Sequence, residues 1–359
     1  MVVKTIQNSL FDEGRYLDIK FPLPQYLGSK YIHKDWIARW IPEEVEVVLD
    51  AFGGSQSIAF LCKQLGKNVI TNDFLTFNSK IGKALIENKT EILTEEDLKI
   101  LFSENSDPGK YNLMEELYTN LFFTEDETSF LDSFRSNIRF LGNEYKKALA
   151  FSIMNRAMTR KVTMGHFAHT QALVYASDPN RIKRNRSLIT PLRTLFTDLL
   201  VEYNNAVFDN NKECRSYNQD ILELLPQLSN IDMAYFDPPY CDSHADYQSF
   251  YHLLETYTNY WKDKEFINGT KRYSPKKKSG FDTKNEMIDS LVKMFRLSEG
   301  IPYWLISYND RSYPDVETLS NLIESYRNVR VERKPYTAGR GGKGSVAGSS
   351  EILLICTPK

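Results

Sequence analysis

Residues 46–57 read EVVLDAFGGSQS, and this stretch decides the fold class. Residues 46–50 form an apolar run of the kind found in buried strands. Gly53 and Gly54 follow the run and indicate a tight turn. Apolar residues then continue with helical spacing to Leu65, and Gly66 is a typical residue just past the end of a helix. The stretch therefore predicts a strand, a glycine turn and a helix in direct succession.

The same rhythm recurs further along the chain. Residues 68–71 predict a second strand, which ends at Asn72 and Asp73, and a helix is expected over residues 76–88. Because strands that alternate with helices usually pair in parallel, we expect an α/β fold with a Rossmann-like parallel sheet. The rhythm resumes late in the chain, with strands expected over residues 213–217, 231–236, 303–307, 328–334 and 351–356. The last two strands are joined by a glycine-rich segment, residues 337–350, which we expect to be mobile.

The alternation stops between residues 91 and 210. This segment is charged and mainly helical in pattern, with one well-formed apolar helix around residues 145–158. We therefore expect residues 22–90 and 211–359 to form a sheet domain. Residues 91–210 are expected to form a second domain inserted into it.

The formal net charge of −2 hides a strong segregation of sign within the insertion. Acidic residues dominate residues 91–132, where only Lys99 and Lys110 oppose them. Basic residues dominate residues 155–193, where Asp178 alone opposes them. Such segregation can present a positive face to a polyanion, and the alternative is an ordinary solvated surface.

Composition narrows the protein class. The chain has 359 residues, of which 42% are hydrophobic and 26% charged, as is ordinary for a globular protein. Its four cysteines lack paired spacing, which excludes a disulfide scaffold and a CxxC zinc module, and the five histidines leave little for a metal site. No apolar stretch approaches the length of a membrane span, and charges interrupt the first residues. We expect a cytoplasmic protein without a membrane partner or a metal.

The tetrapeptide Asp237-Pro238-Pro239-Tyr240 carries the sharpest chemical signal, because it follows the strand expected over residues 231–236. Ligands of open α/β sheets bind at the carboxyl ends of strands. The prolines stiffen the turn and remove backbone donors, which leaves carbonyl oxygens available as acceptors. A carboxylate, a fixed carbonyl and an aromatic ring together suit a planar ligand that bears an amino group. The alternative is a proline-rich turn with an incidental aspartate.

Two further aspartates end secondary-structure elements. Asp73 lies about 20 residues after the glycine turn, where an acidic residue can bind ribose hydroxyls. Asp220 is placed either to contact a cofactor or to cap a short helix. Asp73 can likewise be a helix cap, and this alternative stays open.

Taken in order, these motifs resemble those of the Dam-type, or alpha-group, DNA adenine-N6 methyltransferases. Residues 25–30, QYLGSK, resemble the amino-terminal cofactor motif of that family, and residues 50–54 its glycine motif. Asn72-Asp73 resembles the acidic motif, and residues 237–240 the catalytic motif. The resemblance extends over residues 22–357. The insertion falls where the family has its target-recognition domain.

The resemblance implies S-adenosylmethionine as the cofactor. It assigns cofactor contacts to Tyr26, Lys30, Asp50, Phe52, Gly53, Gly54 and Asp73, with Lys30 near the cofactor carboxylate and Asp220 as a further candidate. Asp237 and the Pro238 carbonyl would hold the target amino group of an adenine flipped out of double-stranded DNA, and Tyr240 would stack on the base. The chain departs from the family pattern at Gln56 and Ser29, where glycine is commoner. The target sequence cannot be carried over.

The basic part of the insertion is the expected DNA contact. The candidates are Arg156, Arg160, Lys161, Arg181, Lys183, Arg184 and Arg186. A cognate restriction endonuclease is a further candidate partner. Two alternatives stay open: methylation of cytosine at N4, which the same chemistry would serve, and a non-catalytic DNA-binding protein with a vestigial cofactor site.

Overall fold

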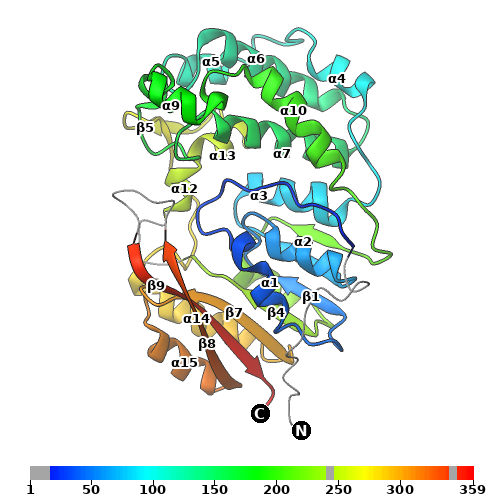
Figure 1. Cartoon of the computed structure of the whole chain (residues 1–359), viewed down its shortest axis with the longest axis vertical. Helices are drawn as coiled ribbons and strands as arrows, with labels where there is room; N and C mark the ends of the chain where they lie inside the picture. The colour runs from blue at the N-terminus through cyan, green and yellow to red at the C-terminus, as the bar shows by residue number, and fades with distance from the viewer. Residues whose placement is uncertain (1–16, 240–245, 339–345) are drawn as a thin grey trace.

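A computed structural model describes residues 17–239, 246–338 and 346–359 of the chain. A seven-stranded sheet makes up the lower part of the molecule, and most of the inserted helices lie above it (Figure 1). The strands stand in the order β3-β2-β1-β4-β7-β9-β8. Their bounds are Val47–Asp50 (β1), Asn68–Asn72 (β2), Arg215–Tyr217 (β3), Met233–Phe236 (β4), Tyr303–Asn309 (β7), Asn328–Ala338 (β8) and Val346–Thr357 (β9).

The sheet is parallel apart from one strand. β3, β2, β1, β4 and β7 pair in parallel, whereas β9 is antiparallel to both β7 and β8. After β1 the chain moves outward through β2 and β3, then crosses to the other side of β1 for β4. The strand order therefore reverses between β1 and β4, which is where open α/β sheets bind ligands. The predicted Rossmann-like sheet is confirmed.

Burial on both faces explains the apolar strands. Val48 of β1 packs into the core cluster on one face, and its neighbour Leu49 packs into the cluster on the other face. One face is covered by α1 (Lys34–Ala38), α2 (Ser57–Gln64), α3 (Thr76–Ile81) and the π-helical turn η2 (Gly82–Glu87). The other face is covered by α11 (Ile221–Leu224), α14 (Lys284–Leu297) and α15 (Val316–Glu324).

The carboxyl-terminal hairpin is longer than the sequence predicts. β8 continues through Ala338 and β9 begins at Val346, so much of the segment expected to be a mobile connection is paired strand. Strand pairing uses main-chain groups, so small residues do not prevent it. Residues 339–345 lie outside the described part of the chain.

The insertion is helical, as expected. Its helices are α4 (Glu95–Leu101), α5 (Leu113–Tyr118), α6 (Glu125–Asn137), α7 (Glu144–Arg160), α8 (Ala172–Ala176), α9 (Pro179–Arg184) and α10 (Leu192–Asn204). Capping boxes at Thr94 and Thr124 start α4 and α6. Phe196 of α10 and Val48 of β1 belong to the same core cluster, so the insertion shares a core with the sheet.

A later segment packs against the inserted helices. It comprises α12 (Tyr247–Phe250), α13 (His252–Asn259) and the antiparallel pair β5 (Glu265–Ile267) and β6 (Arg272–Ser274). Tyr260 Oη donates a hydrogen bond of 2.6 Å to Asp132 of α6, and Asn155 of α7 donates one of 3.1 Å to Thr258. Figure 1 shows α13 and β5 beside these helices. The segment of residues 247–274 therefore contacts the inserted helices although it follows residue 211 in the chain.

Candidate active site

Three aspartates meet at the carboxyl edge of the sheet. Asp50 ends β1, Asp73 directly follows β2, and Asp237 directly follows β4. All three line one cavity of about 110 Å³, together with Tyr26 and Lys30 from the chain before β1. The cavity lies at the switch point between β1 and β4, and the parallel pairing of β2, β1 and β4 brings the aspartates together.

The glycine turn after β1 is held close to β2. Gly53 N–H donates a hydrogen bond of 2.8 Å to Asn72 O, and Gly54 N–H donates one of 2.7 Å to Asp73 Oδ2. Gly54 has a φ of +50°, and a Cβ there would lie 3.3 Å from the Tyr26 ring. Gln56 has a φ of +66°, which accounts for the preference for glycine at this point of the family pattern.

Asp73 is buried and its carboxylate is engaged by the surrounding main chain. Oδ1 accepts hydrogen bonds from Leu75 N–H at 2.8 Å and from Asn78 Nδ2 at 3.2 Å, while Oδ2 accepts the bond from Gly54. Burial raises the pKa of Asp73 to about 6, although the hydrogen bonds from Leu75 and Gly54 favour the carboxylate. Asp73 thus organises both the glycine turn and the start of α3, whatever it contacts in the cavity.

Asp50 has an acceptor atom to spare. Its Oδ2 accepts a hydrogen bond of 3.1 Å from Ala59 N–H, whereas the buried Oδ1 has no hydrogen-bond partner among the described residues. Burial and the nearby charges of Asp237 and Asp73 raise the pKa of Asp50 to about 8. A cationic or hydrogen-donating ligand in the cavity would relieve both effects.

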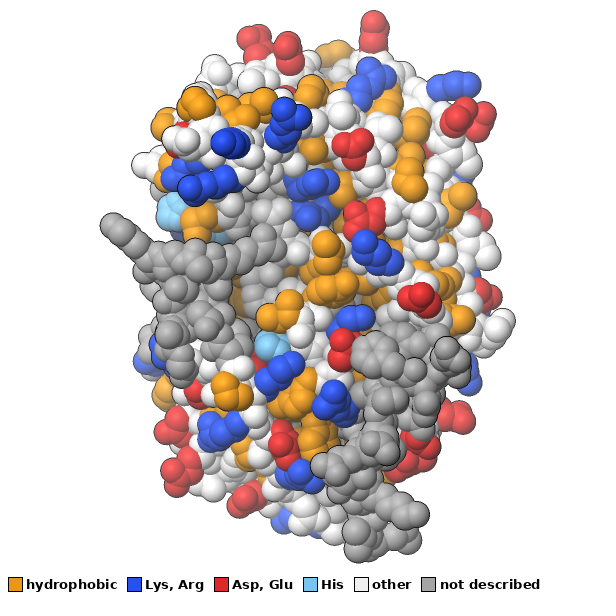
Figure 2. All heavy atoms as spheres, viewed as in Figure 1, with side chains coloured by type: hydrophobic (Ala, Val, Ile, Leu, Met, Phe, Trp, Pro, Cys, Tyr) orange, Lys and Arg blue, Asp and Glu red, His pale blue; other side chains and the backbone are white. Residues whose placement is uncertain are grey.

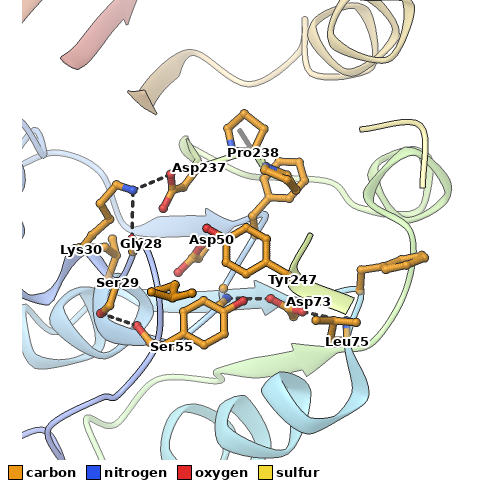
Figure 3. A pocket seen from close by; sticks show the side chains of 18 of the residues that line it. Gly28, Ser29, Lys30, Asp50, Ser55, Asp73, Leu75, Asp237, Pro238 and Tyr247 are labelled. Carbon is orange, nitrogen blue, oxygen red and sulfur yellow. Dashed lines mark hydrogen bonds and ion pairs between the residues drawn. The ribbon is translucent and has the colours of Figure 1, made fainter. Parts of the chain in front are cut away.

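Lys30 joins Asp237 to a carboxylate from the far end of the chain. Its Nζ lies 2.9 Å from Asp237 Oδ1, 3.5 Å from Glu351 Oε1 and 3.2 Å from Gly28 O. Figure 3 shows the Lys30 side chain extended toward Asp237 at the rim of the pocket. Burial favours the neutral amine, but the charges of Asp237 and Glu351 outweigh it and raise the pKa of Lys30 above its ordinary value. The predicted contact between Lys30 and the cofactor is untested, and in the structure the Lys30 ammonium forms an ion pair with Asp237.

The structure describes two of the three remaining residues of the catalytic tetrapeptide. Pro238 and Pro239 line the cavity beside Asp237. The Asp237 side chain is 19% exposed, so it is accessible from the cavity despite its ion pair. Tyr240, predicted to stack on the target base, lies outside the described residues.

Aromatic rings form one wall of the cavity. Tyr26 stacks on Tyr247 with ring centroids 5.6 Å apart, and on Tyr251 at 4.9 Å. Phe52, predicted as a cofactor contact, also lines the cavity and packs edge-on against Phe281. Tyr247 was missed by the sequence analysis, because nothing in its local sequence indicates that α12 returns to the cavity.

Residues after β6 complete the same wall. Gln248 of α12 bonds twice to the main chain of Lys277, accepting from its N–H and donating to its O at 2.9 Å each. The Lys277 ammonium pairs with Glu255 at 2.6 Å, and this glutamate also accepts hydrogen bonds from the first turn of α3. These contacts hold Ser279 and Asp282 at the cavity. The segment around residues 262–284 thus contributes to the pocket, which its sequence did not indicate.

Asp220 lies apart from this group. It caps α11, where its Oδ1 accepts a hydrogen bond of 2.8 Å from Leu222 N–H, and it is not among the residues that line the cavity. The structure thus supports the capping alternative for Asp220. Its contact with a cofactor stays an untested prediction.

The predicted DNA contacts fall into two groups, and the first is internal. The Lys161 ammonium is buried, pairs with Glu127 at 2.7 Å and donates to Thr190 O at 3.0 Å. Its side chain therefore stabilises the insertion, and its contact with DNA stays an untested prediction. Arg156 donates hydrogen bonds to Leu23 O and Gln25 Oε1, which tie α7 to the segment that leads into Tyr26.

The second group is presented at the surface. We call Arg181, Lys183, Arg184 and Arg186 the α9 basic cluster. Figure 2 shows Lys and Arg side chains gathered at the upper left of the molecule, where Figure 1 places α9. Arg160, Arg181 and Arg184 line a second cavity of about 620 Å³, which also touches Gln25. Gln25 immediately precedes Tyr26, which lines the active-site cavity.

Two further observations on the described part of the chain concern membrane-spanning helices and metal-binding groups of side chains. There, no helix is long and apolar enough to cross a membrane. No group of three or more His, Cys, Asp or Glu side chains in the described ranges is placed to hold a metal ion.

Comparisons with known proteins bear on the whole arrangement. The chain is 33% identical over 347 residues to the Type II methyltransferase M2.HphI of Haemophilus parahaemolyticus, which covers 94% of this chain and 98% of that protein. It is 26% identical over 335 residues to the modification methylase StsI of Streptococcus sanguinis, covering 87% of this chain and 48% of that protein. The family model for D12 class N6 adenine-specific DNA methyltransferases matches residues 26–309, from Tyr26 to the end of β7. The chain therefore belongs to the D12 class N6 adenine-specific DNA methyltransferase family.

Proposed function

We propose that this DNA adenine methyltransferase takes its methyl group from S-adenosylmethionine and transfers it to a flipped-out adenine held at Asp237. The observation that carries the proposal is the meeting of Asp50, Asp73 and Asp237 around one cavity at the strand switch point. Asp50 and Asp73 lie on the cofactor side, next to the glycine turn. Asp237 lies beside the two prolines that shape the amino-group site.

The residues present fit this cofactor. S-adenosylmethionine supplies an electrophilic methyl group on a sulfonium when it is bound. The ligand carries positive charge, and the cavity contains several carboxylates, among them Asp50 with its spare buried oxygen. Gly54 leaves open the space that a Cβ would occupy against Tyr26, so a ligand can approach the main chain closely.

Asp237 acts on the target amino group. The N6 nitrogen of adenine is a weak nucleophile because its lone pair is delocalised into the ring. A hydrogen bond to the Asp237 carboxylate, and one to the Pro238 carbonyl, favour a pyramidal nitrogen whose lone pair faces the methyl group. Lys30 holds the Asp237 carboxylate at 2.9 Å, which favours its ionised, accepting form. The rate then comes largely from positioning, and the proton leaves after the methyl has transferred.

The α9 basic cluster and Arg160 are proposed to bind the phosphates of double-stranded DNA. Support comes from the second cavity, which they line in part and which is also lined by Gln25, the residue before Tyr26. The target base must leave the stack to reach Asp237, since its amino nitrogen is inaccessible inside a duplex. Stacking on Tyr240 stays part of this proposal.

We further propose a role in restriction and modification, with a cognate endonuclease that recognises the same sequence. One relative is named a Type II methyltransferase and the other a modification methylase. The expectation is that DNA from cells that express the protein resists an endonuclease that cleaves the same sequence when it is unmethylated. Cleavage equal to that of unmodified DNA would contradict this role.

The function is tested by identifying the modified base. DNA from methylation-deficient cells that express the protein is hydrolysed, and its nucleosides are separated by mass spectrometry. N6-methyladenine is expected from the wild type and from the Asp198→Ala control, a change on the exposed surface of α10. Asp237→Ala is expected to abolish the product while S-adenosylmethionine and DNA still bind. N4-methylcytosine alone, or methylation retained in Asp237→Ala, would contradict the proposal.

A further inference from the structure

Glu351 is a buried carboxylate whose structural role is slight. It lies on the antiparallel strand β9, and its side chain is 3% exposed. Within the described residues, its Oε1 lies 3.5 Å from the Lys30 ammonium and has no hydrogen-bond partner. A buried charge with so little compensation costs stability, so a fold under selection for stability alone would not favour it.

The placement of Glu351 relates it to the target site. Lys30 lies between Glu351 and Asp237, and its ammonium contacts a carboxylate oxygen of each. We propose that Glu351 is a positioning residue for methyl transfer, which acts by sharing the Lys30 ammonium with Asp237. The inference rests on the proposed role of Asp237 and adds a residue about 110 positions later in the chain to the same site.

The physical effect follows from competition for one ammonium group. With Glu351 ionised, the positive charge of Lys30 is divided between two carboxylates, and Asp237 keeps acceptor capacity for the target amino group. With Glu351 protonated, Asp237 alone neutralises Lys30, and the tighter ion pair competes with the amino group. Methyl transfer is therefore expected to be faster when Glu351 is ionised.

The surroundings place this ionisation in an accessible pH range. Burial raises the pKa of Glu351 to about 7, against the opposing effect of Lys30. The groups that face it are Lys30, Asp237, Asp310 after β7, Tyr235 of β4 and Tyr247 of α12. Neither Lys334 nor His33 supplies a compensating charge to Glu351. Lys334, opposite Glu351 on β8, has its ammonium over the Trp36 ring, and burial lowers the pKa of His33 to about 4.

The experiment measures single-turnover methyl transfer at saturating DNA and S-adenosylmethionine between pH 6 and 9. The wild-type rate is expected to rise through about pH 7. Glu351→Gln imitates the protonated form, so its rate should be lower at pH 8 by about 10-fold or more, the scale of a misplaced reacting group. The rise through pH 7 should also disappear, while the affinity for S-adenosylmethionine, measured by calorimetry, stays the same.

Two further variants make the result specific. Glu332→Gln is the matched control. Glu332 pairs with Arg330, and both lie on β8, the strand next to the β9 strand that carries Glu351. The pH profile of this variant should follow that of the wild type. Glu351→Asp keeps the charge but shortens the side chain. Its rise should persist and move to higher pH, because a carboxylate farther from Lys30 is less stabilised. If Glu351→Gln unfolds more readily in urea than the wild type, the pH profile of Glu351→Asp tests the proposal in its place.

The outcomes separate the two proposals. A wild type that binds no S-adenosylmethionine or transfers no methyl group would overturn the proposed function itself. An active wild type whose pH profile is unchanged by Glu351→Gln, or by Glu351→Asp when the Gln variant is unfolded, would overturn the role of Glu351. A loss of rate with an unchanged pH inflection would show that Glu351 is only structural, and would equally refute the inference.

Discussion

Replacement of Asp73 by alanine should weaken the fold and the cofactor site together. The change removes the acceptor for Gly54 N–H and for Leu75 N–H, at 2.7 and 2.8 Å. Two main-chain donors left without a partner cost about 1–3 kcal/mol each, so the free energy of unfolding should fall by about 2–6 kcal/mol. The glycine turn loses one of its two hydrogen bonds to the end of β2 in the same step, and the bond from Gly53 N–H to Asn72 O remains. We expect the affinity for S-adenosylmethionine to fall by about 1–3 kcal/mol, the scale of removing a charged partner.

Asp220→Ala is the matched comparison for Asp73→Ala. Asp220 also caps a helix, but it does not line the cavity. Its loss should cost about 1 kcal/mol of stability, as for other N-caps, with no change in cofactor affinity. Urea unfolding and calorimetric titration of S-adenosylmethionine measure both quantities. The reasoning would be refuted if Asp73→Ala bound the cofactor as tightly as wild type, or if Asp220→Ala lost affinity to the same extent.

Three other predictions concern DNA binding and pH. Neutralising the α9 basic cluster should weaken binding to cognate and to random DNA by similar factors. In titrations at several salt concentrations, each phosphate interaction removed should lower the slope of log K against log salt by about 0.9. A selective loss of cognate binding would indicate base contacts instead. Lys161→Ala should leave that slope unchanged but cost about 1–3 kcal/mol in urea unfolding, because it removes the ion-pair partner of Glu127 and the donor to Thr190 O. Asp50, with its pKa raised to about 8, binds a proton more tightly in the folded state, so stability should decline as pH rises from about 4 to 8. Asp50→Asn should make that decline shallower by up to about 1.4 kcal/mol per pH unit, and a slope equal to that of wild type would place the titration elsewhere.

The site residues that the sequence analysis identified share a property of position. Asp50, Asp73 and Asp237 each stand at the end of an apolar strand. Parallel strands bring their carboxyl ends to one edge of a sheet, so the strand pattern alone predicts that these carboxylates meet. Their separation in the sequence, with the whole insertion between Asp73 and Asp237, does not weaken that inference.

The residues that the sequence analysis missed lack such a position. Tyr247 and Gln248 reach the cavity because α12 packs against residues 166–167 of the insertion, and Glu351 reaches Lys30 because β9 lies next to β7. No local period or spacing encodes these approaches. Charge type was also insufficient: Lys161 and Lys183 occur in the same basic stretch, yet one is buried against Glu127 and the other is exposed.

The sequence by itself determined the fold class, the edge of the sheet at which the chemistry lies and the family, because these follow from local hydrophobic periodicity and from short motifs in a fixed order. The tertiary structure alone decided which charges face each other. Lys30 is assigned to Asp237 and Glu351, Asp220 is a cap outside the cavity, and the segment around α13 joins the inserted helices. Ion pairing and burial depend on distances between segments far apart in the chain, and these distances are fixed only when the helices and strands pack.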